Sequence, residues 1–130
     1  MDKILVVDDE VVVCDLLENF LTLKGYEVNT ASDSYTAVKK VKKLSPHLVL
    51  LDIVMPGISG IQLLKKIKKL NPKTRVIMIT AVPDQGIITE SIDLGAYDCI
   101  RKPMDLKHVE SFVRIAIKNS KRSQNSEIRK

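Results

Sequence analysis

The chain has 130 residues, 45% of them hydrophobic and only 4% aromatic, which predicts a single domain with an aliphatic core. It has no run of roughly 20 apolar residues and no signal-peptide pattern, so neither a membrane span nor secretion is expected. Of the net charge of +5, a balance of +4 belongs to residues 118–130. The other 117 residues hold 16 basic and 15 acidic side chains, which argues against nucleic-acid binding by this domain.

Short apolar runs of strand length alternate five times with segments of helical periodicity. The first strand is predicted over residues 3–7. The apolar side chains that follow it have the spacing of one buried helix face, and they are Val13, Leu16, Leu17, Phe20 and Leu21. Gly25 stands where a left-handed residue would end this helix. A second strand is predicted over residues 26–30, and a second helical stripe runs from Ala37 to Leu44.

The third predicted strand, residues 47–51, is almost continuously apolar, which is typical of the centre of a parallel sheet. Ser59 and Gln62 have the spacing of a capping box that opens the next helix. The remaining elements are a strand over residues 76–79, a weaker helix over about 85–94, a strand over 97–101 and a helix that begins after Asp105. Five such units predict an α/β fold whose parallel sheet has helices on both faces.

Polar side chains stand where four of the five strands end. Asp8 and Asp9 follow the first strand, Asp52 the third, Thr80 the fourth and Lys102 the fifth. The carboxyl ends of parallel strands meet at one edge of a sheet, where ligands bind. Three clustered carboxylates need a cation, and oxygen ligands suit Mg²⁺. With a lysine and a hydroxyl for anionic oxygens, the set predicts a phosphoryl group held against a nucleophilic carboxylate.

Each of these residues has an ordinary structural interpretation when it is taken alone, as a helix cap, a strand residue or a solvated lysine. Their joint occurrence, in order, favours a site. A phosphatase with an aspartyl nucleophile would usually have a second acid where Val54 stands. A flavin site would need a Ser/Thr-rich loop in place of Asp9 and Glu10.

Four segments carry a resemblance to the receiver domains of response regulators. They are ILVVDDE (residues 4–10), LLDIVMPGISG (50–60), ITA (79–81) and KP (102–103), and the resemblance covers about residues 2–118. It implies a doubly wound, flavodoxin-like sheet in the order 2-1-3-4-5. It also implies a phosphoacceptor rather than an enzyme with a separate substrate. Residues 119–130 are predicted to be a basic, disordered tail or a linker.

The resemblance assigns roles by position. Asp52 aligns with the phosphoacceptor. Asp9 is similar to the direct Mg²⁺ ligand, Asp8 to an acid that acts through a metal-bound water, and the backbone carbonyl of Val54 to the third protein ligand. Mn²⁺ is expected to substitute for Mg²⁺.

The resemblance also assigns roles at the ends of the fourth and fifth strands. Lys102 resembles the residue that pairs with the phosphoryl group, and the bond to Pro103 is typically cis in this family. Thr80 resembles the switch hydroxyl, and Ala81 is small enough to leave the site open.

Two features depart from the family's usual pattern. Receivers usually have Phe or Tyr where Cys99 stands, with a ring that moves on activation; Tyr97 is expected on the same strand face as Cys99. We therefore expect activation to act mainly through the loop after Thr80. In the family, the positions of Val54 and Val82 flank the path of the hydrolytic water, and two apolar side chains there imply slow self-dephosphorylation.

The implied phosphodonor is a sensor histidine kinase or a phosphotransfer protein. The implied output partner is a downstream protein or an output domain that meets the fourth helix, fifth strand and fifth helix, with a phosphorylation-linked homodimer as a further expectation. The alternative is a receiver-like interaction module that works without phosphorylation, although such proteins typically lose an acid or the lysine. Free cysteines at positions 14 and 99 predict a reduced, cytoplasmic setting. The lysine runs 39–43 and 65–69 are interpreted as solvated helix faces, with an acidic partner as the second interpretation.

Overall fold

A parallel β-sheet forms the centre of the molecule, as seen in a computed structural model that describes residues 1–55, 58–81 and 84–129 and side chains as far as Asn119. Its strands are β1 (Lys3–Val7), β2 (Glu27–Ala31), β3 (Leu48–Asp52), β4 (Arg75–Thr80) and β5 (Asp98–Arg101). They alternate with the helices α1 (Val11–Leu23), α2 (Ser34–Leu44), α3 (Gly60–Leu70), α4 (Gln85–Asp93) and α5 (Leu106–Arg129). The order β2-β1-β3-β4-β5, with all neighbours parallel, confirms the predicted topology.

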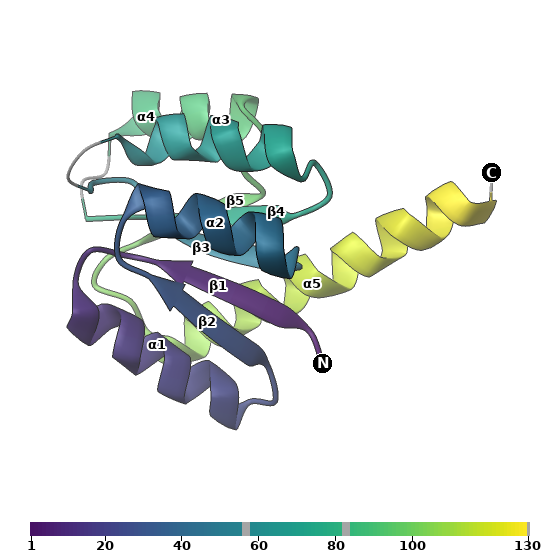
Figure 1. The fold of residues 1–130 in the computed structure, drawn as a ribbon, viewed down its shortest axis with the longest axis horizontal. Helices are drawn as coiled ribbons and strands as arrows, with labels where there is room; N and C mark the ends of the chain where they lie inside the picture. Colours follow the sequence, from purple (N-terminus) through teal and green to yellow (C-terminus); the bar gives the residue numbers. More distant parts are fainter. Residues whose placement is uncertain (56–57, 82–83, 130) are drawn as a thin grey trace.

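Helices cover both faces of the sheet, and each face has its own apolar cluster. α2, α3 and α4 contribute to the cluster on one face, and α1 and α5 to the cluster on the other (Figure 1). Successive side chains of a strand point to opposite faces. Leu5 and Leu51 therefore join the first cluster, whereas Ile4 and Leu50 join the second. Because β1 and β3 are buried on both sides, their sequences are continuous apolar runs.

The buried face of α1 differs by some residues from the predicted one. Cys14, Leu17 and Leu21 are buried, whereas Leu16, which we predicted to lie on the apolar face, is 49% exposed. The three buried residues have the helical spacing i, i+3, i+7, so the sequence offers two overlapping apolar faces. Packing against the sheet and α5 selects between them.

Local signals at helix ends are found where the sequence predicts them. Ser59 and Gln62 make both hydrogen bonds of a capping box at the start of α3. Asp105 accepts a hydrogen bond from the backbone amide of Lys107 at the start of α5. Gly25 follows α1 with a φ of 96°, a conformation that is strained for residues with a side chain.

The last helix extends further than the sequence predicts. α5 continues to Arg129 through a segment for which we predicted a disordered tail or a linker, and Figure 1 shows its last turns extending beyond the sheet. The prediction relied on the lack of an apolar stripe in residues 119–130. The segment also lacks Gly and Pro and contains Lys, Arg, Gln and Glu, which favour helix. A domain boundary at residue 118 stays a prediction. In the described ranges no helix is both long and apolar enough to cross a membrane.

Candidate functional site

Three carboxylates meet at the carboxyl edge of the sheet. Asp8 and Asp9 follow β1, and Asp52 is the last residue of β3, the strand next to β1. One oxygen from each carboxylate lies within 4.8 Å of the other two. Asp8 and Asp52 are buried, with 1% and 4% of their surface exposed, whereas Asp9 is exposed. The predicted convergence of these acids is therefore found in the structure.

Backbone amides orient the two buried carboxylates. The amide of Glu10 donates to Asp8 Oδ1 over 2.9 Å, and the amide of Val54 donates to Asp52 Oδ1 over 3.1 Å. In each case the bond comes from the residue two positions later, so the loop after the strand fixes the acid that ends it. The Oδ2 atoms of both carboxylates are left on the side of Lys102.

Lys102 reaches this cluster from the segment after β5. Its Nζ lies 3.2 Å from Asp8 Oδ2, 3.5 Å from Asp52 Oδ2 and 3.7 Å from Glu10 Oε1. Burial alone would lower the pKa of Lys102. The hydrogen bond to Asp8 and the charges of Asp8, Asp52 and Glu10 outweigh burial and raise this pKa. The lysine is therefore charged at neutral pH.

Glu10 is a member of the site that the sequence interpretation did not include. It is exposed and lies directly before α1, but its side chain makes no capping hydrogen bond. Instead its carboxylate is the third that pairs with the Lys102 ammonium, after those of Asp8 and Asp52. The only signal in the sequence was its place directly after the Asp8–Asp9 pair.

The ionised form of Asp52 is disfavoured in the folded protein. Burial raises the pKa of its carboxyl, the hydrogen bond from the Val54 amide opposes this, the charge of Asp8 raises it further, and Lys102 lowers it. The net direction is upward. Lys102 therefore does not fully offset the desolvation of Asp52 and its repulsion by Asp8, and a divalent cation would stabilise the ionised Asp52 further. The oxygen donors present fit Mg²⁺ or Mn²⁺.

The remaining predicted residues lie around this centre. Thr80, the last residue of β4, is buried, and its carbonyl accepts a hydrogen bond of 2.8 Å from the Lys102 amide. The peptide bond between Lys102 and Pro103 is cis, as the resemblance implied. Ala81 is exposed next to Thr80. Val82 lies outside the described residues.

Two supports of the site have no direct chemical role. Gly60, the first residue of α3, lies against the backbone of β3: a Cβ there would stand 2.6 Å from the carbonyl oxygen of Asp52 and from Cα of Ile53. Real Cβ atoms do not come this close, so only glycine fits without a shift of the loop. On the other side, the thiol of Cys14 donates to the carbonyl oxygen of Asp8 over 3.2 Å.

Cys99 and Tyr97 do not share a face, so the expectation from strand alternation is wrong. Cys99 packs against the cluster under α2 and α3, and Tyr97 against the cluster under α1 and α5. Tyr97 lies before β5, where strand alternation does not apply; its ring stacks 4.8 Å from the guanidinium of Arg75 and its hydroxyl accepts from Asn119. Burial raises the pKa of the half-buried Cys99 thiol.

Comparison with known proteins identifies the family. The sequence model of the response regulator receiver domain matches residues 4–114. The chain belongs to this family. The receiver is 37% identical over 108 residues to the chemotaxis protein CheY of Thermotoga maritima, which covers 82% of this chain and 90% of CheY.

The chain is also similar to a sporulation protein and to a receiver domain of known structure. It is 37% identical over 113 residues to the sporulation initiation phosphotransferase F of Bacillus subtilis, covering 87% of this chain and 91% of that protein. The crystal structure of a CheY-like receiver domain protein from Methanospirillum hungatei superposes with a TM-score of 0.92 at 28% identity, covering 95% and 98% of the two chains. The receiver is thus a phosphoacceptor signalling domain of the CheY-like fold.

Proposed function

We propose that Asp52 is the residue that accepts the phosphoryl group and that Lys102 and Thr80 hold this group after transfer. The main support is one arrangement: Oδ2 of the buried Asp52, at the end of β3, lies 3.5 Å from the Lys102 ammonium, and two further acids lie in the same cluster. An anionic group attached to Oδ2 would meet the ammonium directly. Thr80 is the last residue of β4, the strand next to β3, and its hydroxyl would donate a hydrogen bond to a phosphoryl oxygen.

The transfer forms one bond and breaks one bond. Oδ2 of Asp52 attacks the phosphorus of the donor, the O–P bond forms and the bond from phosphorus to the donor's imidazole nitrogen breaks. The electron pair of that bond returns to the imidazole. The amide of Val54 holds Oδ1 during this step and so keeps Oδ2 directed at the donor. Hydrolysis of the acyl phosphate later restores the carboxylate.

Asp9, Asp52 and the backbone carbonyl of Val54 would hold Mg²⁺, with Asp8 acting through a bound water. The ion supplies positive charge for the phosphoryl oxygens during transfer. Asp9 is the exposed acid of the cluster and would meet an incoming cation first, whereas buried Asp8 is already hydrogen-bonded to Lys102 and the Glu10 amide.

A sensor histidine kinase or a phosphotransfer protein is the proposed donor, in the cytoplasm. The proposed output surface consists of α4, β5 and α5, where a downstream protein, an output domain or a second copy of the chain would bind. Exposed apolar side chains on this surface include Ile92 and Ile115, with 44% and 50% of their surface exposed. β5 follows β4 at the edge of the sheet, so the surface lies directly beside Thr80 and Lys102.

Intact mass after incubation with acetyl phosphate tests the proposal. We expect a gain of one phosphoryl group that requires Mg²⁺ and is lost in Asp52→Asn. Asp93→Asn, which changes an exposed aspartate on α4, is the matched control and should be labelled like the native protein. If the native protein gains no phosphoryl group while a known receiver is labelled, the alternative of a phosphorylation-independent interaction module would replace the proposal.

A further inference from the structure

Positive charge is concentrated in one part of the receiver, although the body as a whole is nearly neutral. Residues 34–75 contain ten basic side chains and one acid, the buried Asp52. α2 and α3 carry eight of these lysines and pack beside each other on one face of the sheet. The runs KKVKKL and KKIKKL occupy the same place at the end of each helix. The net charge of +1 for residues 1–117 hides this uneven distribution, because acidic side chains elsewhere in the domain offset the lysines.

Several of these lysines have structural roles that explain them. Lys40 donates to the carbonyl of Thr30, and Lys68 donates to the carbonyls of Pro72 and Thr74. The lysines in the last turns of α2 and α3 complement the negative ends of the helix dipoles. Lys65 and Lys66 are exposed earlier in α3, and in the described part of the chain neither pairs with a carboxylate.

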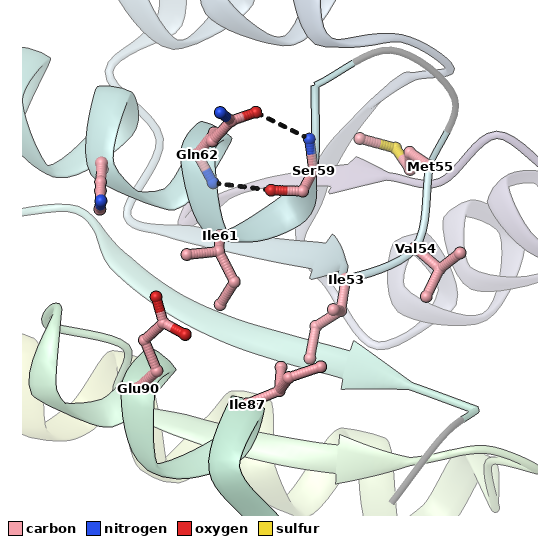
Figure 2. Close-up of a pocket in the computed structure, with 9 residues that line it drawn as sticks. Ile53, Val54, Met55, Ser59, Ile61, Gln62, Ile87 and Glu90 are labelled. Carbon is pink, nitrogen blue, oxygen red and sulfur yellow. Dashed lines mark hydrogen bonds between the residues drawn. The ribbon is translucent and has the colours of Figure 1, made fainter. Parts of the chain in front are cut away.

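Lys65 also borders an apolar groove between α3 and α4 of about 720 Å³. Figure 2 shows Ile53, Ile61 and Ile87 converging on it from the end of β3, from α3 and from α4. Val54, at its rim, is 61% exposed. Glu90 lines the α4 side. Among the described side chains no ion pair joins Lys65 to Glu90, so both charges face the solvent at the groove.

We propose that this groove and the lysines beside it form a docking site for an acidic polypeptide segment of a partner protein. An aliphatic side chain of the segment fills the space between Ile61 and Ile87, and its acidic residues extend over Lys65 and Lys66 toward α2. This combination of an apolar anchor and flanking charge is a common way to bind a peptide. The site shares α4 with the proposed output surface, but it lies between α4 and α3 and includes no residue of β5 or α5 among those that line the groove.

The composition of the surface favours a polypeptide over other anions. A nucleic-acid backbone has no aliphatic group to fill an apolar groove, and α2 and α3 contain no Arg for bidentate contacts and a single aromatic residue, Tyr35. A membrane would need a cluster of apolar side chains that can insert, but the exposed large apolar side chains of these helices are Tyr35, at the start of α2, and Leu70, at the end of α3.

The opposed charges of Lys65 and Glu90 give the site a polarity. Acidic residues are attracted on the α3 side and repelled on the α4 side of the groove. The bound segment therefore has its acids on one side of the aliphatic anchor and neutral or basic residues on the other.

Selection from a random peptide display library on the 130-residue chain tests the proposal. We expect enriched peptides to contain an aliphatic residue flanked by Asp or Glu on one side only. Synthetic versions, measured by fluorescence anisotropy, should bind Lys65→Glu/Lys66→Glu roughly tenfold more weakly at low salt. Lys107→Glu/Lys24→Glu makes the same change of net charge at exposed positions outside the segment 34–75, and should bind like the native protein.

The groove itself is tested separately from the charge. Ile61→Ser should weaken binding of the same peptides without changing far-ultraviolet circular dichroism, and Glu90→Lys should strengthen binding of peptides with acids on both sides. The proposal is overturned if no peptide is enriched, if enriched peptides lack acids or an aliphatic anchor, or if a short DNA duplex binds the lysine face and the peptides do not. An Ile61→Ser protein that binds peptides unchanged would also overturn it.

Discussion

Lys102 donates a hydrogen bond of 3.2 Å to Asp8, which lies 94 positions earlier in the chain. The same ammonium is 3.5 Å from Asp52, so a single cation links the ends of β1 and β3 with the segment after β5. The lysine already occupies the charge environment that a divalent cation or a phosphoryl group would enter.

Replacing Lys102 by methionine should strengthen Mg²⁺ binding. The ammonium pairs with the carboxylates of Asp8 and Asp52, which a bound metal ion would also use, so removing the ammonium would remove both a competitor and a repelling charge. At an effective dielectric between those of water and a protein surface, we expect roughly tenfold tighter binding by isothermal titration calorimetry. Lys107→Met, at an exposed position of α5, is the control. Equal or weaker Mg²⁺ binding by Lys102→Met would contradict the competition.

The stability of the metal-free protein should depend on the ionisation of Asp52. Its folded-state pKa is raised, first by burial, so the ionised carboxyl destabilises the fold. This cost is absent below the ordinary pKa of 3.8 and fully present once the pH exceeds the folded-state pKa. In EDTA, Asp52→Asn should therefore melt at a higher temperature than the native protein at pH 7. The difference should disappear as the pH falls toward 3.8.

Asp33 provides a comparison of the opposite sign. Hydrogen bonds from the amide and the hydroxyl of Thr36 lower the pKa of this exposed carboxyl, so its ionised form stabilises the fold above the ordinary pKa. That stabilisation is lost as the pH falls through the lowered value. Asp33→Asn should consequently melt no higher than the native protein at pH 7. If Asp33→Asn raised the melting temperature at pH 7 as Asp52→Asn is expected to do, the rise for Asp52→Asn could not be attributed to the burial of its carboxylate.

Gly60→Ala should destabilise the fold and disturb the site together. The new methyl group would overlap the carbonyl of Asp52 and the backbone of Ile53, which cannot move without shifting the loop. We expect a loss of about 2 kcal/mol in urea unfolding. Gly86→Ala, in α4, is the matched control, because its Cβ would meet only the flexible carboxylate of Asp84 at 3.1 Å. An unfolding free energy unchanged by Gly60→Ala would mean that the loop adapts freely.

Val54→Asn should shorten the lifetime of the phosphorylated protein. The side chain of Val54 is 61% exposed beside the acceptor and cannot hydrogen-bond a water molecule. An amide at this position would order the attacking water, and we expect decay to be about tenfold faster. Val54→Ala removes bulk without adding a polar group, so it distinguishes the ordering of the attacking water from easier access of water to the site. Equal decay of the native protein and the Val54→Asn variant, followed by intact mass after donor removal, would refute the prediction.

Much of the site could be predicted because its residues end strands. Asp8, Asp52 and Thr80 each terminate an apolar run, and parallel strands bring their carboxyl ends to one edge whatever the details of packing. The parallel topology was predicted in the same way, and the starts of α3 and α5 were predicted from local hydrogen-bonding signals that operate within a few residues. The prediction for Tyr97 was wrong because this residue lies just before β5, where the alternation of side chains along a strand does not apply.

The sequence by itself determined the α/β alternation, the acids at the sheet edge and the lysine that joins them, since these depend on periodicity and on local signals. Only the tertiary structure decided which face of α1 is buried, that Glu10 lies near Lys102, and that Gly60 must lack a side chain. It also placed the lysines of α2 and α3 on one surface beside an apolar groove. Each of these depends on distances between segments that are far apart in the chain. Packing sets these distances, and the composition of the sequence does not reveal them.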